Sequence, residues 1–220
     1  MGTKTVFHLI SFLIYAGTAY FDYGMVKGKM LPIPNQFFSK FVWLTLIDLY
    51  IQILYHFIAI FISVFGGKHP IFHFLSRAIV APVAMTVVSL FWLLYTFDPN
   101  TLLADDLAKQ MIGIVWYNNV LHTLPLITAI VDTVIWNHGH VAAPKAIKAI
   151  GVFATLYIID IHVVHHISGF WAYPILGDLI LPLRAVFIVA CMSVLFMNYK
   201  ITECLHTAIH GKSTHKKKAT

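Results

Sequence analysis

Charged residues are scarce in this sequence, and cysteines are scarcer still. Only 11% of the 220 residues are charged, whereas 59% are apolar. A soluble domain of this length needs a more polar surface, so the composition excludes that class and favours a membrane protein. The two cysteines lie within and just beyond the last apolar stretch, and this placement excludes a disulfide framework.

Also missing is a basic stripe interleaved with aromatic residues on a polar segment, the pattern typical of nucleic-acid binding. The net charge of +6 therefore does not indicate a nucleic-acid partner. It fits loops that face the anionic inner leaflet of a membrane. We expect a membrane-embedded protein whose partner is lipid, and the sequence identifies no protein partner.

Long uncharged stretches recur along the whole chain instead. A hydrocarbon core about 30 Å thick needs about 20 apolar residues per helix. The sequence therefore predicts an all-α fold, a polytopic membrane bundle of about six transmembrane helices. This six-span domain fills residues 1–200, and a short basic cytosolic tail follows at 201–220. The predicted spans are Val6–Tyr23, Phe41–Phe65, Ile79–Phe97, Ile112–Trp136, Ala146–Ile167 and Leu179–Tyr199.

Lysine and arginine set the expected orientation. With the N-terminus inside, ten of the 15 such residues fall in inner segments and five in outer ones. This excess predicts that both termini are cytosolic. Lys217 and Lys218 resemble a dilysine retrieval signal, so we expect a multi-pass protein of the endoplasmic reticulum, the cell membrane, or both.

Polar residues inside the predicted spans form stripes at helical spacing. In the second span the stripe is Thr45, Asp48, Gln52 and His56, and in the fifth it is Thr155, His162 and His166. An ionisable side chain is costly within lipid, so each one is a functional candidate by default. Gln52 and Thr155, taken singly, are as well explained by hydrogen bonds between helices.

The fourth span carries Asn118, His122 and Pro125 on one face. Proline cannot donate a backbone hydrogen bond, so we expect a kink and an opened turn beside His122. At 1.5 Å per residue, His122 lies about 15 Å deep from the outer face, with Thr45 and His162 in the same half of the membrane. The three helices therefore converge on one candidate site.

Four sequence blocks, in the same order, resemble the family of androgen-induced gene 1 and the androgen-dependent tissue-factor-pathway-inhibitor-regulating protein. They are FVWLTLIDL from Phe41, VSLFWLLYTFD from Val88, WYNNVLHTLP from Trp116 and VHHISGFWAYP from Val164. The resemblance implies a multi-pass hydrolase that cleaves fatty acid esters of hydroxy fatty acids. It places a threonine nucleophile at Thr45 and its histidine partner at His122, with no metal or other cofactor.

Residue chemistry agrees with those two roles. A threonine hydroxyl needs an adjacent base, and histidine suits that task near neutral pH. Asp48, one turn from Thr45, is a candidate to orient the imidazole. Asn118 is a candidate oxyanion donor. His162 and His166 are candidates for the polar lining of the site.

The residues leave three other interpretations of the function open. His162, His165 and His166 form an HxxHH box, which with the His69/His73 and His206/His210 pairs suggests a diiron lipid desaturase or hydroxylase. The predicted topology places the box and the two pairs on opposite sides of the membrane. A haem carrier would use His56, His122 and His162. The last reading is a non-enzymatic lipid-binding or regulatory scaffold.

Overall fold

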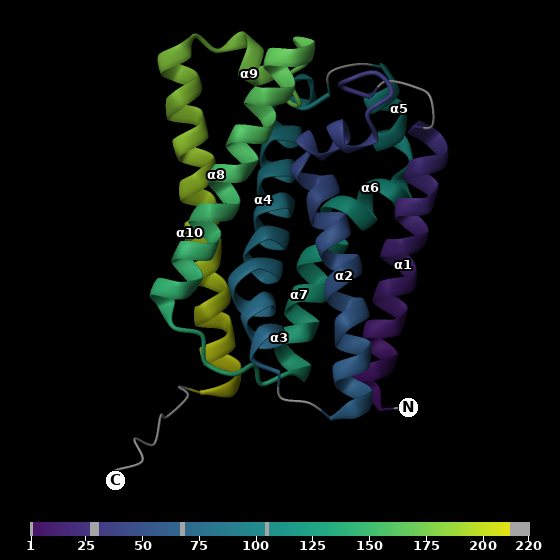
Figure 1. Cartoon of the computed structure of the whole chain (residues 1–220), viewed down its shortest axis with the longest axis vertical. Coiled ribbons are helices and arrows are strands. Elements are labelled where there is room, and N and C mark those ends of the chain that lie inside the picture. Colours follow the sequence, from purple (N-terminus) through teal and green to yellow (C-terminus); the bar gives the residue numbers. More distant parts are fainter. Residues whose placement is uncertain (1, 27–30, 67–68, 104–105, 212–220) are drawn as a thin grey trace.

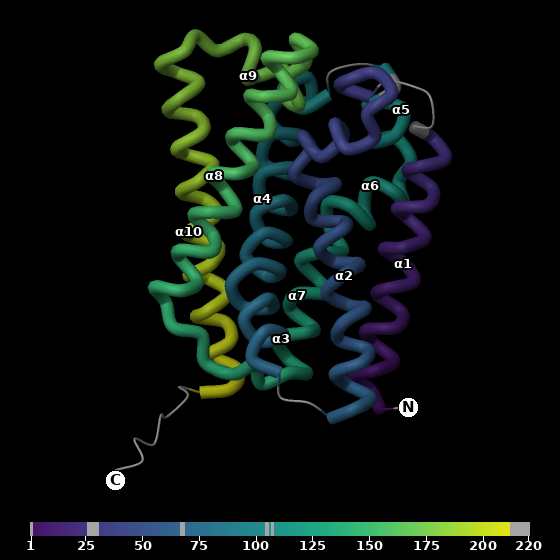
Figure 2. The backbone as a smooth tube through the Cα atoms, in the orientation of Figure 1, coloured from purple at the N-terminus to yellow at the C-terminus, as the bar shows by residue number. Residues whose placement is uncertain are grey.

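The computed structural model describes residues 2–26, 31–66, 69–103 and 106–211, and these residues form helices and short connections without any strand (Figure 1). The longer helices lie side by side and run the height of the molecule. The backbone tube shows that the short helices α5 (Asp106–Gly113) and α9 (Pro174–Asp178) both lie at the upper end of the bundle (Figure 2). The all-α polytopic bundle expected from the sequence is present.

Helices α1 (Thr3–Val26) and α2 (Leu44–Phe65) form a close antiparallel pair (Figure 1). Tyr15 of α1 and Leu49 of α2 are buried in one apolar cluster. The same face of α1 also buries polar side chains, including His8 and Asp22. The 3-10 helix η1 (Phe37–Val42) leads into α2 at its upper end. α2 ends at Gly66, whose positive φ of 71° is easily adopted only by glycine.

The next helical segment is longer than the predicted span at 79–97. It begins with α3 (Pro70–Leu75), passes through a π-helical turn, η2 (Ser76–Val80), and continues as α4 (Ala81–Phe97). Pro70 suits a first helical position because its missing N–H would have no partner there. The π turn ends two residues before Pro82, which lacks the donor that a regular α-helix would use.

The fourth predicted span is broken as expected. α6 (Val115–His122) and α7 (Leu124–Ile135) meet at Thr123 and are bent by 46°. α8 (Ala143–Ser168) then returns to the upper end, and α10 (Leu181–His210) descends beside it. Buried small residues allow η2 and α8 to pack closely, namely Ala78 of η2 and Ala146 and Ala154 of α8.

Four described segments are long and apolar enough to cross a membrane, and a fifth is obtained if the bent pair counts as one span. They are Leu44–Phe65, Pro70–Phe97, Ala143–Ser168, Leu181–His210 and the Val115–Ile135 pair. α1 is not among them, since its buried polar residues lower its hydropathy. The sequence predicted about six spans, whereas length and composition identify four or five among the described residues.

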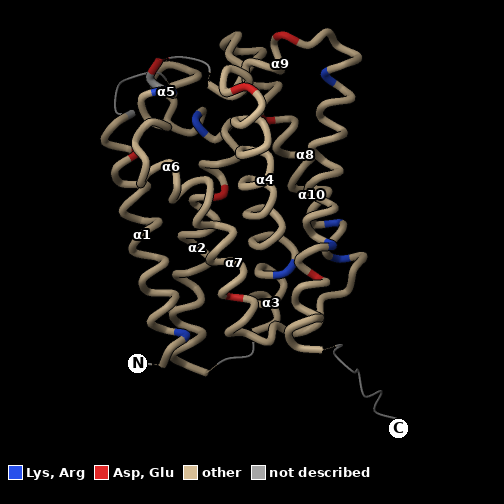
Figure 3. Tube along the Cα trace, turned by 180° about the vertical axis from the view of Figure 1, so that it is seen from behind, with Lys and Arg blue, Asp and Glu red and all other residues tan. Residues whose placement is uncertain are grey.

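The start of α1 and the end of α10 lie at the same end of the bundle (Figure 1). α10 continues to His210, so residues 201–210 belong to this helix, whereas the sequence predicted a tail from residue 201. The dilysine segment lies outside the described residues. Lysine, arginine and acidic residues are sparse along the bundle (Figure 3).

Candidate functional site

Thr45 and His122 lie within hydrogen-bond distance of each other. Thr45 is the second residue of α2, His122 is the last residue of α6, and Thr45 Oγ1 is 3.2 Å from His122 Nε2. His122 is 4% exposed, so the contact is shielded from solvent. The structure thus brings together the two residues that the sequence singled out as nucleophile and base.

The imidazole of His122 is fixed by two further contacts. Its Nδ1 is 2.7 Å from Oδ1 of Asn118, one turn earlier on α6. Because an amide oxygen only accepts, Nδ1 carries the proton and Nε2 presents a lone pair toward Thr45. The ring also stacks on Phe91, with 3.5 Å between ring centroids. His122 is therefore oriented to accept a proton from the Thr45 hydroxyl.

The break between α6 and α7 gives His122 its position. A helix broken by proline leaves carbonyl oxygens without their usual donors. The indole N–H of Trp92, on α4, donates to the carbonyl oxygen of His122 at 2.7 Å and lies 3.2 Å from Thr123 Oγ1. This contact ties the end of α6 to α4.

Thr45 is anchored from the opposite side by the segment before α9. The backbone N–H of Leu44 donates to the hydroxyl of Tyr173 at 3.2 Å, and the indole of Trp43 donates to the carbonyl of Ala172 at 3.1 Å. The first residues of a helix have backbone N–H groups without intrahelical partners. Tyr173 satisfies one of them and so places its hydroxyl beside the start of α2.

Two cavities meet at Thr45. The first, which we call the α8 cavity, holds about 910 Å³ of empty space including its opening, between α4, α8 and α10. The second, which we call the α6 cavity, holds about 850 Å³ between η1, α5 and α6. Thr45, Phe91, Leu102 and Tyr173 line both cavities. A bound molecule can therefore extend to both sides of the threonine hydroxyl.

The two cavities differ in their polar groups. The described lining of the α8 cavity contains no charged side chain, and Phe153 and Ile188 are typical of it. The α6 cavity is lined by His122 and also by Asp22 and Lys40, which form a buried ion pair. Apolar walls on both sides suit hydrocarbon chains.

Asp48 was expected to orient the imidazole and Asn118 to donate to the oxyanion, but the contacts of both residues differ from these expectations. Oδ1 of Asp48 accepts from Gln52 at 3.1 Å, and its other oxygen is buried without a partner among the described residues. The expected contact between Asp48 and His122 is not formed, because Asp48 faces the next turn of its own helix. Asn118 contacts His122 instead, through its side-chain oxygen. An oxyanion donor would use the side-chain N–H group, so this contact does not support the expected oxyanion role.

His162 and His166 do not line either cavity, contrary to expectation. His162 Nδ1 lies 2.7 Å from the carbonyl oxygen of Ile158 on its own helix, and His166 is exposed. The α8 residues that line the α8 cavity are Phe153, Ala154, Tyr157, Ile158 and Ile161. The rotation of α8 about its axis therefore directs the two histidines away from the site.

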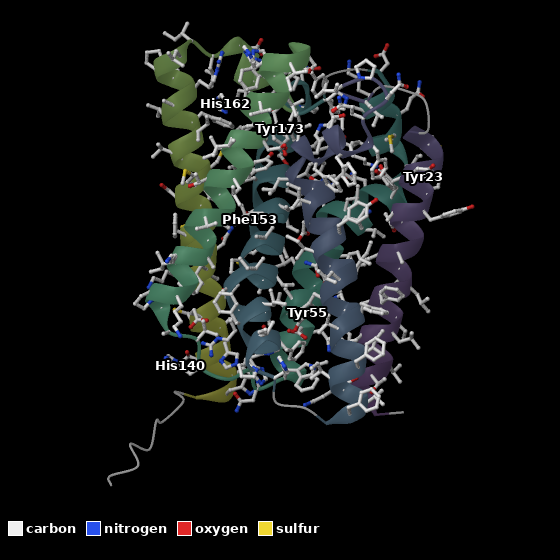
Figure 4. All side chains as sticks on the ribbon, viewed as in Figure 1. Tyr23, Tyr55, His140, Phe153, His162 and Tyr173 are labelled. Carbon is white, nitrogen blue, oxygen red and sulfur yellow. The ribbon has the colours of Figure 1, made fainter. Side chains whose placement is uncertain are left out.

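The histidines of the HxxHH box do not gather around a common point. His165 stacks on Trp171, with 3.8 Å between ring centroids. His162 lies at the upper end of the bundle, whereas α3, which carries His73, lies at the lower end (Figures 1 and 4). Within the described ranges, no three His, Cys, Asp or Glu side chains are placed to hold a metal ion together. The three histidines of the haem hypothesis have separate partners, since His56 contacts His8, His122 contacts Thr45, and His162 contacts a carbonyl of its own helix.

A second buried polar cluster lies lower in the bundle, around Asp132. Oδ2 of Asp132 accepts from Tyr55 at 2.8 Å and Ser76 at 2.9 Å and lies 2.8 Å from His138 Nε2. Tyr55 and Tyr173 lie at clearly different heights (Figure 4), so this cluster is separate from Thr45. It joins α2, η2, α7 and the segment after α7.

Three residues that line the site were not predicted from the sequence, namely Asp22, Lys40 and Tyr173. The signal was present for Asp22, a carboxylate within a predicted span, which is costly unless it is paired. Lys40 directly precedes the second predicted span, and Tyr173 belongs to the last of the four resembling blocks. Only tertiary packing brings these residues to Thr45.

A family model described as FAR-17a/AIG1-like protein matches residues 3–207. The chain belongs to the FAR-17a/AIG1-like family. Among its FAR-17a/AIG1-like relatives, the androgen-induced gene 1 protein of Homo sapiens is 27% identical over 128 residues, which is 58% of this chain and 53% of the relative. The androgen-dependent TFPI-regulating protein of Mesocricetus auratus is 23% identical over 105 residues, 48% of this chain and 45% of the relative. The chain spans about half the length of these FAR-17a/AIG1-like proteins, and no solved structure matches it.

Proposed function

We propose that this protein is an intramembrane threonine hydrolase that cleaves fatty acid esters of hydroxy fatty acids. The observation that carries the proposal is the 3.2 Å contact between Thr45 Oγ1 and His122 Nε2. A hydroxyl beside an oriented imidazole is the arrangement that activates a weak oxygen nucleophile. The resemblance of the four sequence blocks supplies the substrate class.

In the first half of the reaction, His122 Nε2 takes the hydroxyl proton while Thr45 Oγ1 attacks the ester carbonyl. Asn118 accepts from Nδ1–H and so stabilises the imidazolium that forms. The imidazolium then gives its proton to the leaving alkoxide, which departs as the hydroxy fatty acid. In the second half, His122 activates a water that releases the fatty acid from Thr45.

The negative charge on the carbonyl oxygen needs a donor, and Tyr173 is our candidate. Its hydroxyl accepts from the Leu44 amide at 3.2 Å, beside the nucleophile, and its side chain lines both cavities. The O–H of Tyr173 can then donate to the oxyanion as charge develops.

The arrangement of the cavities supports a substrate with two long arms. An ester between two hydrocarbon chains has its carbonyl in the middle, and Thr45 lies where the α8 and α6 cavities meet. Lipid esters partition into hydrocarbon, so a site among membrane helices can receive them without extraction into water. We further propose that the enzyme acts in the endoplasmic reticulum or the cell membrane, with both termini cytosolic.

The test is hydrolysis of a hydroxy-fatty-acid ester by purified protein in lipid nanodiscs. We expect Thr45→Ala to abolish turnover and His122→Ala to lower kcat by roughly 10²- to 10⁴-fold. Thr207→Ala is the matched control, because Thr207 donates only to a carbonyl of its own helix, α10. Turnover by Thr45→Ala at the wild-type rate would end the proposal.

A hydroxyl-directed fluorophosphonate probe separates the hydrolase from a non-enzymatic scaffold. We expect the probe to label wild-type protein at Thr45, as identified by mass spectrometry of the modified peptide. Thr45→Ala should remain unlabelled, whereas Thr207→Ala should be labelled normally. A folded wild-type protein that is not labelled and cleaves no ester would favour the scaffold.

A further inference from the structure

Lys40 is a lysine buried completely within a membrane bundle. The residue is 0% exposed, and its ammonium group pairs with Asp22, which is 1% exposed. The ammonium also lies over the ring of Phe37, 5.0 Å from its centroid. A buried ion pair is weak evidence of stabilisation, since an apolar pair of similar size often serves as well. The pair therefore calls for a functional explanation.

Within the described part of the chain, the hydrogen bonds of this pair leave donors on Lys40 unused. An ammonium group has three N–H donors. Among the described residues, Asp22 is the hydrogen-bond acceptor that the ammonium contacts. The other oxygen of Asp22 accepts from the hydroxyl of Tyr117 at 2.8 Å, which fixes the carboxylate from a second side. Lys40 lines the α6 cavity and so can offer its remaining donors to an anion there.

The location of His122 indicates which substrate arm enters the α6 cavity. His122 lines the α6 cavity and is absent from the described lining of the α8 cavity. The leaving alkoxide must receive its proton from His122, so the leaving hydroxy acid belongs on the His122 side of Thr45. That arm carries the free carboxylate of the substrate.

We propose that Lys40 binds the free carboxylate of the hydroxy-acid arm in the α6 cavity, while the uncharged acyl arm occupies the α8 cavity. The assignment rests on the proposed hydrolase function and adds an anion-binding residue to it. Asp22 holds the ammonium in place when the cavity is empty. Lys40 thus makes the enzyme selective for lipid esters that also carry a free acid.

The test compares one substrate with the methyl ester of its free carboxylate. We expect wild-type protein in nanodiscs to have a KM for the acid roughly 10- to 100-fold below that for the methyl ester, as a charge-assisted hydrogen bond implies. The variant is Lys40→Met with Asp22→Asn, so that no unpaired carboxylate stays buried. Its KM for the acid should rise to the methyl-ester value, so that the preference for the acid is lost.

Two further variants control this measurement. Lys109→Met removes a lysine from α5 whose side chain is 52% exposed, and it should keep the preference for the acid. Lys40→Arg retains the charge and should keep most of that preference, even if the double variant folds poorly. Equal losses for acid and methyl ester in the double variant would overturn the proposal, as would a wild-type enzyme without preference.

A binding experiment distinguishes failure of the proposed hydrolase function from failure of the proposal for Lys40. If wild-type protein cleaves neither ester, the binding of a brominated fatty acid and a brominated fatty alcohol is measured by quenching of tryptophan fluorescence. Stronger binding of the acid that disappears in the double variant would support Lys40 as an anion site without catalysis. Equal binding of acid and alcohol by the wild-type protein would overturn it.

Discussion

The imidazole of His122 lies almost parallel to the ring of Phe91, with centroids 3.5 Å apart and an angle of 11° between the planes. This stack fixes the plane of the imidazole, while the hydrogen bond to Asn118 fixes its rotation within that plane. Both restraints are needed because a small displacement of a catalytic group costs rate steeply.

Replacing Phe91 by leucine removes the stack and leaves an apolar side chain in its place. We expect kcat for the ester to fall roughly 10- to 100-fold, since the imidazole loses its alignment with Thr45. The matched control is Phe97→Leu at the end of the same helix, where the side chain is 83% exposed. An unchanged kcat in Phe91→Leu would show that the stack does not position the base.

Asn118 can be tested by two substitutions of similar size. Asn118→Leu removes the acceptor for Nδ1–H, so the imidazole can adopt the wrong tautomer, and we expect kcat to fall by about 10² or more. Asn118→Asp keeps an oxygen at the same place and should retain substantial activity. The measurement is kcat for both variants, and equal activities would contradict the orienting role.

Tyr173→Phe removes one hydroxyl beside the nucleophile. If Tyr173 donates to the oxyanion, kcat should fall by roughly 10²- to 10³-fold with little change in KM. Tyr23→Phe, on the half-exposed part of α1, is the corresponding control. A rise in KM at constant kcat would instead assign the hydroxyl to substrate binding.

The Asp132 cluster is expected to stabilise the fold rather than to take part in catalysis. Asp132→Asn weakens the hydrogen bonds to Tyr55 and Ser76, and we expect a loss of about 1–3 kcal/mol in the free energy of unfolding. Unfolding in detergent measures this loss, and the exposed Asp178→Asn should be neutral. A loss of activity without a loss of stability would contradict the structural role.

Helix rise fixes depth, so the sequence could predict that Thr45 and His122 lie in the same half of the membrane, and the family resemblance implied their pairing. Apolar stretches located the spans, and counting residues placed both side chains in the same half of the membrane. Pro125 indicated the break that the structure has at Thr123. These inferences depend on distances along a helix, which the sequence specifies.

What the sequence could not specify was the rotation of each helix about its axis and the path of the connections. Asp48 and Asn118 are each one turn from a proposed catalytic residue, yet only Asn118 contacts the imidazole. His162 and His166 fall on a face of α8 turned from the cavity. Lys40 of η1 meets Asp22 of α1 through tertiary packing, which spacing along the sequence does not specify.

The two cavities also have a consequence for the order of product release in the proposed mechanism. In that mechanism the hydroxy acid departs first and vacates the space beside His122, while the acyl chain stays attached to Thr45 in the α8 cavity. Within a bilayer, another lipid alcohol competes with water for that vacated space. We therefore expect acyl exchange alongside hydrolysis, measurable as transfer of the acyl group to an added isotope-labelled hydroxy fatty acid. Without such exchange, water alone has access to the acylated threonine.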